Sequence, residues 1–395
     1  MGRPAPLALY GLATGLFEPF APMLLGRRAR RGKEDPVRLG ERLGRASIAR
    51  PSGKLVWIHA VSVGESLSHL PVVERLHAER PDLTLLVTSG TRTSAELLAR
   101  RLPPGVLHQY APIDAPQAAA RFLDHWRPSM AMFIESELWP NLLLAARRRG
   151  VRLVLLGGRI SEKSARAWDR APATARSMLG LFDAIYAQDL ETRDWIEDHG
   201  VAVAGRLDLK RLAEPLPCDE VELARLSAAC AGRKVVVVPR HPERGAEVAE
   251  ALQALGWRIA WRSKAEAVGP EVEAYVADTL GELGLFYRLA DAVVLGGAFL
   301  EGLSGHNPLE PARFARPIVT GPHHDSFAEI YADLIGEKAV LIAPGRAELK
   351  AALQALLAEP GVAEALGRRA EAVAAGGRRA LDAAWSRLQQ LAPAP

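Results

Sequence analysis

The first half of the chain alternates short, continuous apolar runs with longer segments of mixed polarity. Apolar strands separated by helices of about 10–15 residues are typical of a parallel sheet that is covered on both faces. The runs predict strands at residues 54–59, 83–88, 106–110, 129–134, 151–156 and 184–187.

The same alternation begins again after a proline-containing stretch at residues 214–217. It predicts a second set of strands at residues 235–238, 258–261, 292–295 and 317–320. Helices dominate from Arg346 onward. This order predicts two doubly wound, Rossmann-like α/β domains with a cleft between them. We place the two domains at residues 34–205 and 206–395.

A different pattern occupies residues 1–33. An apolar segment from Ala5 to Leu25 contains Glu18 and three prolines, and its uninterrupted part is too short to cross a bilayer unaided. A basic cluster follows it, made of Arg27, Arg28, Arg30, Arg31 and Lys33. We interpret the segment as an in-plane or re-entrant membrane anchor whose cations contact anionic lipid head groups. The alternatives are a spanning helix and a helix that docks on the protein itself.

Composition adds only a few constraints. The 395 residues are 49% hydrophobic and 24% charged, which is ordinary for a globular chain. The two cysteines, Cys218 and Cys230, exclude a disulfide framework and a zinc site of ordinary spacing. The five basic residues at the N-terminus account for the formal net charge of +4. We expect no nucleic-acid partner and no metal cofactor.

Carboxylates follow two of the predicted strands in the first half. The first strand leads into His59-Ala-Val-Ser-Val-Gly-Glu65-Ser, which places Glu65 in the first turn of a helix at the sheet edge where α/β proteins bind ligands. Burial would raise the pKa of such a carboxyl toward the value a general base needs. The alternative is an acid that only complements the helix dipole. The fourth strand ends in Glu135-Ser-Glu137, followed by Trp139 and Pro140.

Cations and hydroxyl groups follow other strand ends. The fifth strand leads into Arg159 and Ser161, which suit a phosphate or carboxylate group, although a solvated charge run is the alternative. In the second half, Pro239-Arg240 follows a strand directly and is well placed for a phosphate. Lys210 lies near the predicted domain junction and offers another cation.

The segment from Val293 to Pro311 combines paired glycines with a predicted helix start. Asn307 is a suitable N-cap and Pro308 suits the first helical position. Such a helix start, with Gly305 before it, can hold a phosphate, and Glu310 can accept hydrogen bonds from sugar hydroxyls. This pattern favours a nucleotide-activated sugar, and an ordinary capped loop is the alternative.

Taken together, these motifs resemble the 3-deoxy-D-manno-octulosonic acid (Kdo) transferases of lipopolysaccharide synthesis, which have the two-domain GT-B fold. The resemblance runs from the N-terminal anchor to the C-terminus. It is carried by residues 59–66, 135–141, 159–164, 239–244 and 305–310. It implies transfer of Kdo from CMP-Kdo to the lipid A precursor lipid IVA, with inversion and without a metal. It also implies a location at the cytoplasmic face of the inner membrane.

The resemblance assigns roles to individual residues. Glu65 matches the catalytic base and Glu137 matches a second required acid. The residues that would bind the donor CMP-Kdo are Pro239, Arg240, Gly305, Asn307, Glu310 and Lys210. Lys210 matches a basic position of the family's hinge region. We assign contacts with the acceptor or the transition state to Ser62, Gly64, Glu135, Arg159 and Ser161.

The chain departs from the family pattern in its second half. Relatives usually carry an extra strand and helix before the Pro-Arg-His motif, and the strand ends in a Gly-Glu-Glu loop near the donor. Here residues 231–238 run straight into Pro239, as if about thirty residues, one strand-helix unit, were absent. We therefore expect the second sheet to be one strand short or altered in order. Ser304 replaces a glycine, and residues 325–327 replace an Asn-Phe pattern.

Two other functions compete with Kdo transfer. One is a related GT-B enzyme with another nucleotide-sugar donor, such as a UDP-sugar. The other is a non-catalytic homologue that has lost donor binding through the shortened second domain. The presence of Glu65, Glu137, Arg240 and Glu310 favours an active Kdo transferase.

Overall fold

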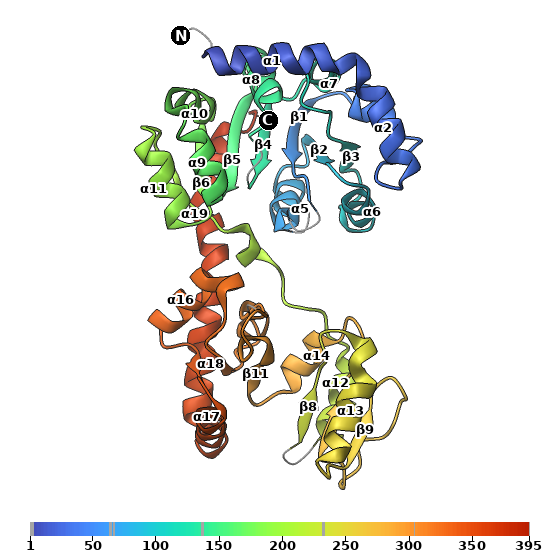
Figure 1. The fold of residues 1–395 in the computed structure, drawn as a ribbon, viewed down its shortest axis with the longest axis vertical. Helices are drawn as coiled ribbons and strands as arrows, with labels where there is room; N and C mark the ends of the chain where they lie inside the picture. The colour runs from blue at the N-terminus through green and yellow to red at the C-terminus, as the bar shows by residue number, and fades with distance from the viewer. Residues whose placement is uncertain are drawn as a thin grey trace. The chain divides into compact units, whose positions relative to one another are not determined.

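The chain forms two compact units, each built of parallel strands and helices, as the apolar pattern predicts (Figure 1). The computed structural model describes residues 4–62, 65, 68–135, 138–230, 234–303 and 305–394. The first unit comprises Met1–Ala213 together with Gly377–Pro395, and the second comprises Glu214–Gly376.

The first unit contains a seven-stranded parallel sheet with the order β3-β2-β1-β4-β5-β6-β7. Its strands are β1 (Lys54–His59), β2 (Leu83–Ser89), β3 (Leu107–Tyr110), β4 (Met130–Ile134), β5 (Arg152–Gly158), β6 (Ala184–Ala187) and β7 (Gly205–Arg206). All six predicted strands are present. The added strand β7 has only two residues, too few to form an apolar run. The register pairs His59 with Thr88 and Phe133, so β1, β2 and β4 end at one edge.

Helices cover both faces of this sheet. One face packs against α5 (Leu70–Glu79), α6 (Arg92–Arg101) and α19 (Gly376–Leu391). The opposite face packs against α7 (Pro116–Trp126), α8 (Pro140–Arg148), α10 (Pro172–Leu179) and α11 (Leu190–Asp198). The shorter helical segments are α3 (Leu39–Arg42), α9 (Glu162–Trp168) and η2 (Leu209–Leu212).

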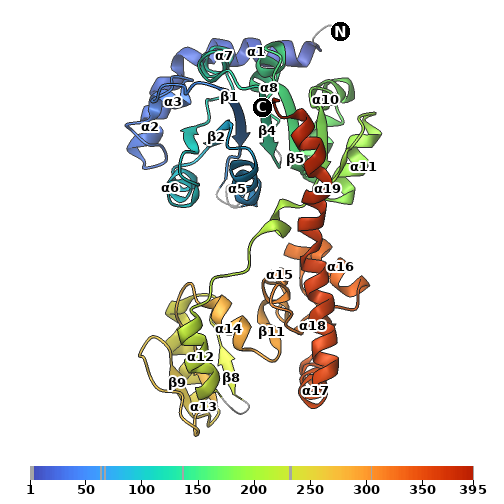
Figure 2. The same cartoon turned by 180° about the vertical axis from the view of Figure 1, so that it is seen from behind.

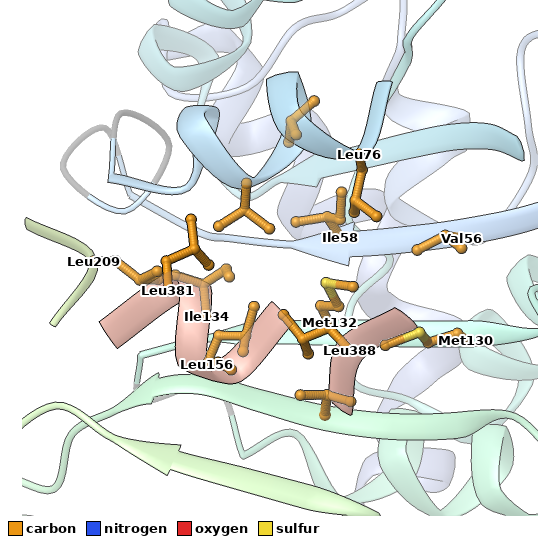
Figure 3. Close-up of a cluster of buried hydrophobic side chains, with 14 of the residues drawn as sticks. Val56, Ile58, Leu76, Met130, Met132, Ile134, Leu156, Leu209, Leu381 and Leu388 are labelled. Atoms are coloured by element: carbon orange, nitrogen blue, oxygen red, sulfur yellow. The ribbon is translucent and has the colours of Figure 1, made fainter. Parts of the chain in front are cut away.

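The last helix, α19, belongs to the core of the first unit. Leu381, Trp385 and Leu388 recur on one helix face and are buried in one cluster with Ile58 and Met132 of the sheet. Figure 3 shows Leu381 and Leu388 beside these two sheet residues. The predicted second domain of residues 206–395 is therefore too long at both ends, because residues 206–213 and 377–395 lie in the first unit. The apolar face of α19 covers a sheet face that would otherwise be exposed.

The N-terminal segment is helical and lies against the first unit. Helix α1 (Ala5–Phe17), η1 (Glu18–Phe20) and α2 (Ala21–Arg30) follow one another, and α1 lies across α7 and α8 (Figures 1 and 2). Leu7, Gly11, Glu18, Ala21 and Leu25 are buried on its inner face. We call the exposed apolar side the outer face; its large side chains are Leu9, Leu12, Leu16, Phe17, Phe20, Met23 and Leu24.

By length and composition alone, the 26 residues from Ala5 to Arg30 could cross a membrane. The contacts of Glu18 instead describe a docked helix. Its carboxylate is 6% exposed, accepts the Gln117 N–H at the start of α7 (2.9 Å) and pairs with Arg121 (2.9 Å). The segment thus has a docked inner face, which was one of the alternatives to a membrane anchor, and an exposed apolar outer face. Attachment of the outer face to a membrane stays a prediction.

The ion pair between Glu18 and Arg121 predicts a measurable loss of stability in Glu18→Gln. The amide keeps the volume of the side chain but loses its charge, and we expect the free energy of unfolding to fall by about 1–2 kcal/mol. Urea unfolding of the full chain measures this change. Glu162→Gln is the matched control, since Glu162 pairs with Arg166 in full solvent and should change stability by less than about 0.5 kcal/mol. Equal losses in both variants would contradict the docked arrangement.

The second unit contains two three-stranded parallel sheets, ordered β8-β10-β9 and β11-β12-β13. Their strands are β8 (Val235–Val237), β9 (Ile259–Trp261), β10 (Ala274–Val276), β11 (Val293–Leu295), β12 (Ile318–Thr320) and β13 (Leu341–Ile342). The longer helices are α12 (Glu220–Ala229), α13 (Gly245–Ala254), α14 (Leu283–Leu289), α16 (Ala328–Gly336), α17 (Arg346–Ala358) and α18 (Pro360–Ala374). The short ones are η3 (Pro242–Arg244), η4 (Gly296–Ala298), α15 (Leu309–Ala312) and η5 (Asp325–Phe327).

The division into two sheets agrees with the expected change in strand order. In a doubly wound sheet of order 3-2-1-4-5-6, the first strand pairs with the second and the fourth. Within the described residues, β8 and β11 each pair on one side only. Val235 on β8 and Val294 on β11 are 44% and 40% exposed. The expected absence of a strand-helix unit before β8 would leave both of these edges open, because the first strand would lie between them.

Candidate active site

The sheet of the first unit has a switch point between β1 and β4. The chain leaves β1 for β2 on one side and later returns to β4 on the other side. Open α/β sheets bind ligands outside the carboxyl ends of their strands at such a point. Glu65 follows β1 and Glu135 follows β4, and the charge of Glu65 acts on Glu135. The structure therefore brings these two predicted carboxylates to one site.

Hydrogen bonds from its own loop orient Glu65. One carboxylate oxygen accepts the Val61 N–H (2.8 Å), and the other accepts the Ser62 hydroxyl (2.8 Å). The Glu65 N–H in turn donates to Ser62 Oγ (3.3 Å). This is a variant of the Ser-x-x-Glu capping box in which the carboxylate accepts the N–H of Val61 instead of that of Ser62. A carboxylate offers about four lone-pair sites, so capping leaves acceptor capacity for a substrate proton. Gly64, a predicted contact, lies outside the described residues.

Glu135 has an unusual backbone. Its φ is 56°, in the left-handed region that non-glycine residues seldom adopt, and its N–H donates to the Leu156 carbonyl (3.0 Å). Such strain is concentrated at functional sites. Burial raises the pKa of the Glu135 carboxyl, and the charge of Lys210, whose Nζ lies 3.7 Å away, opposes the rise. Glu137 lies outside the described residues.

Two further charged side chains influence the pKa of Glu135. Arg159, after β5, favours its ionised form, whereas Asp208, which sequence reasoning missed, disfavours it. Lys210, expected with the donor residues, belongs to the first unit and lies beside Glu135. Ser161 is exposed and caps α9 by accepting the Ser164 N–H (3.3 Å). The first unit therefore carries acids and cations side by side, which suits a hydroxyl nucleophile on a phosphorylated substrate.

A small cavity adjoins Glu135 within the first unit. Its volume is about 120 Å³, and its polar lining is supplied by Glu135, Arg159, Ser164 and Thr192. The apolar lining includes Trp168 and Trp195. An apolar pocket with few polar groups is typical of a site for a small ligand or for part of a larger one. Neither tryptophan was predicted, since nothing in their local sequence distinguishes them from core residues.

In the second unit, Arg240 reaches residues of the loop after β11. It is exposed directly after Pro239, and its charge acts on both His306 and Glu310. Burial, together with Arg240, lowers the pKa of His306. Burial raises the pKa of Glu310, and the Tyr287 hydroxyl, 3.3 Å from Glu310 Oε2, opposes that rise. Arg240 and Glu310 thus lie within electrostatic range of each other, and their binding of the donor stays a prediction, whereas His306 and Tyr287 were missed.

The predicted helix start at Asn307-Pro308 is wrong by one residue. Helix α15 begins at Leu309 and has four residues, and Pro308 precedes it without a side-chain cap. Asn307 Oδ1 nevertheless accepts the Leu309 N–H (3.1 Å). Gly305 has a φ of 82°, which explains the need for glycine there. A helix of four residues has little dipole, so the start of α15 alone offers little attraction for a phosphate.

The fold and the two charged sites define a class of protein. A glycosyltransferase from Rickettsia africae superposes with a TM-score of 0.51 at 10% identity, covering 86% of this chain and 98% of its own. A UDP-N-acetylglucosamine 2-epimerase from Listeria monocytogenes gives a TM-score of 0.52 at 11% identity, covering 86% and 98%. The fold is that of the GT-B glycosyltransferases.

Sequence comparison then identifies the family. The profile of 3-Deoxy-D-manno-octulosonic-acid transferase (kdotransferase) matches residues 37–210. A probable mitochondrial 3-deoxy-D-manno-octulosonic acid transferase of Arabidopsis thaliana is 34% identical over 90% of this chain and 89% of its own. The Bordetella pertussis enzyme of that name is 33% identical over 97% and 99%. The chain belongs to the Kdo transferase family and is a glycosyltransferase.

The comparison also bears on the shortened second unit. The alignment with the Bordetella pertussis enzyme extends over 434 positions, more than the 395 residues of this chain. That relative therefore carries residues that this chain lacks, and the position of the missing strand-helix unit before β8 stays a prediction.

Proposed function

We propose that this protein transfers Kdo from CMP-Kdo to a lipid A precursor, lipid IVA, with Glu65 as the general base. The main support for this proposal is the position of Glu65 and Glu135 at the switch point between β1 and β4. The charges of Lys210 and Arg159 act on Glu135 at the same place. This combination of acids and cations suits an acceptor that has both a hydroxyl and phosphate groups.

In the proposed reaction, Glu65 accepts the proton of an acceptor hydroxyl as that oxygen bonds to the anomeric carbon of Kdo. The bond from that carbon to the CMP phosphate breaks, and CMP leaves with the electron pair. One displacement of this kind inverts the anomeric centre. Lys210 and Arg159 attract the phosphate groups of the acceptor, and Glu135 orients Lys210.

We assign the donor to the second unit. Arg240 faces the phosphate of CMP, because its guanidinium is exposed at a strand end and carries a permanent charge. The Glu310 carboxylate accepts hydrogen bonds from hydroxyl groups of the donor. The Asn307 amide can accept hydrogen bonds from such groups or donate to them. The reaction needs no metal in this scheme, since cationic side chains neutralise the departing phosphate.

The outer face of α1 and α2 suits a membrane surface. Its exposed leucine, phenylalanine and methionine side chains precede the exposed cations Arg27, Arg28, Arg30, Arg31 and Lys33. Such a helix lies in the interfacial plane of an anionic membrane. We place the protein at the cytoplasmic face of the inner membrane, where a membrane-bound acceptor is within reach.

Incubation of the purified protein with CMP-Kdo and lipid IVA tests the proposal. We expect release of CMP and a lipid product heavier by one or more Kdo residues in mass spectrometry. If CMP-Kdo gives no product while a UDP-sugar raises the melting temperature, the donor is a different nucleotide sugar. If no donor changes the melting temperature, the chain is a non-catalytic homologue.

Arg240→Gln should weaken donor binding. Loss of a charge-assisted contact with phosphate corresponds to about 1.5–3 kcal/mol, so we expect the KM for CMP-Kdo to rise about 10- to 100-fold. Initial rates at varied CMP-Kdo measure this change. Arg244→Gln is the matched control, because Arg244 is 59% exposed and pairs with Glu247 instead. An unchanged KM in Arg240→Gln would remove Arg240 from the donor site.

A further inference from the structure

Helix α1 makes polar contacts that its docking alone does not require. Thr14 Oγ1 accepts a hydrogen bond from Asn141 Nδ2 (2.9 Å) and donates one to the Tyr10 carbonyl (2.8 Å). The Tyr10 hydroxyl bonds the carboxylate of Asp114, and burial together with Asp114 raises the pKa of this tyrosine. The same helix that carries the outer face therefore holds two polar residues of the first unit.

Asp114 and Asn141 fix the beginning of α8. The Asp114 carboxylate accepts the N–H groups of Asn141 (3.3 Å) and Leu142 (2.9 Å), which caps the first turn from another segment. Asn141 Nδ2 also donates to the Asp114 carbonyl (2.8 Å), and Asn141 is 6% exposed. These bonds satisfy helix N–H groups that otherwise lack partners, and they restrict where α8 begins.

The beginning of α8 is also the end of the acidic loop that follows β4. Four residues lie between the strained Glu135 and Pro140, the first residue of α8. Trp139 packs edge-on against His59, at the end of β1, with ring centroids 5.0 Å apart. A shift of α8 would therefore move both strand ends that carry Glu65 and Glu135.

We propose that contact between the outer face of α1 and lipid is transmitted to the beginning of α8 through Tyr10 and Thr14, which act as positioning residues. Lipid holds α1 in place, α1 holds Asp114 and Asn141, and these residues fix the beginning of α8 and Trp139, which contacts His59 at the end of β1. The role of this network in transfer rests on the proposed function, whereas the mechanical link does not. Transfer on a lipid surface is then faster than transfer without one.

Hydrogen exchange of the full chain, with and without phosphatidylglycerol-containing vesicles, tests the link without any substrate. We expect vesicles to slow exchange in residues 139–146 about fivefold, the factor that corresponds to one hydrogen bond. Thr14→Val should bind vesicles equally well in co-sedimentation but lose the slowing, and Thr14→Ser should keep it. Helix α13 of the second unit serves as the internal control and should not change.

A kinetic readout then separates positioning from plain stabilisation. Vesicles should raise kcat in the natural sequence and in Thr14→Ser but not in Thr14→Val, with the KM for CMP-Kdo unchanged. Tyr10→Phe, which removes the bond to Asp114, replaces Thr14→Val if that variant does not fold. Equal slowing of exchange in Thr14→Val, or none in the vesicle-bound natural sequence, would overturn the proposal. Absence of any transfer would instead refute the proposed function and leave the exchange result intact.

Discussion

Glu65→Gln abolishes transfer: we expect kcat to fall by about 10²- to 10⁴-fold, the range that general base catalysis supplies. Glutamine keeps an oxygen that can accept the Val61 N–H, and its amide can donate to Ser62 Oγ, so the capping arrangement survives. What it loses is the lone-pair basicity that takes the acceptor proton. Rates of CMP release at saturating substrates measure the change.

A second variant separates the hydrogen bonds around Glu65 from its charge. Ser62→Ala removes the hydroxyl that bonds Glu65 but keeps the carboxylate, and we expect a stability loss of about 1 kcal/mol. The melting temperature of Glu65→Gln should remain close to that of the natural sequence. If Glu65→Gln retains most of its activity, Glu65 is a cap and the base must be sought elsewhere.

Acidification from pH 7 to pH 5 should weaken the first unit through three histidines whose pKa is lowered in the folded state. Burial lowers the pKa of His59 and that of His108 to about 3, and it lowers the pKa of His69 to about 4. In the unfolded chain each titrates near its ordinary pKa of about 6.5. Below that pH the unfolded state binds protons that the folded state does not, so stability falls as the pH falls. At pH 5 each histidine removes about 2 kcal/mol.

The raised pKa of Asp114 and that of Glu135 act in the opposite direction, since those carboxyls take up protons more readily in the folded state. A variant isolates the histidine contribution. His69→Gln should remove about a third of the histidine-dependent loss between pH 7 and pH 5, measured as the shift of the urea midpoint. His241→Gln is the control, because His241 is exposed in the second unit. A urea midpoint that is equal at both pH values would contradict the prediction.

The sequence predicted the strands of the first unit within one or two residues, because each is a continuous apolar run bounded by helix-forming segments. The strands it missed, β7, β10 and β13, have two or three residues, too few to differ from a loop. The periodicity of α19 shows that Leu381, Trp385 and Leu388 share a face. The periodicity cannot show which core that face packs against, because an apolar helix face could cover the exposed face of either unit's sheets.

In the candidate site, too, the sequence predicted local features but not the contacts between distant segments. Placement of Glu65 and Glu135 at strand ends followed from the chain order, and the spacing of Ser62 and Glu65 already contained the capping box, although we interpreted only the carboxylate. His306 and Tyr287 could not be predicted as partners of Arg240 and Glu310, because nothing in one segment indicates which distant segment will bury it. The docking of α1 depends in the same way on Gln117 and Arg121, far along the chain.

The return of α19 to the first unit has a consequence for biosynthesis. A ribosome makes the chain from its N-terminus, and the second unit, Glu214–Gly376, emerges entirely before α19 does. Until then the sheet face around Ile58 and Met132 lacks the helix that buries it. The second unit can therefore fold before α19 is available to complete the core of the first unit. The nascent first unit therefore presents an apolar face to chaperones and lipid until the second unit and α19 have both been synthesised.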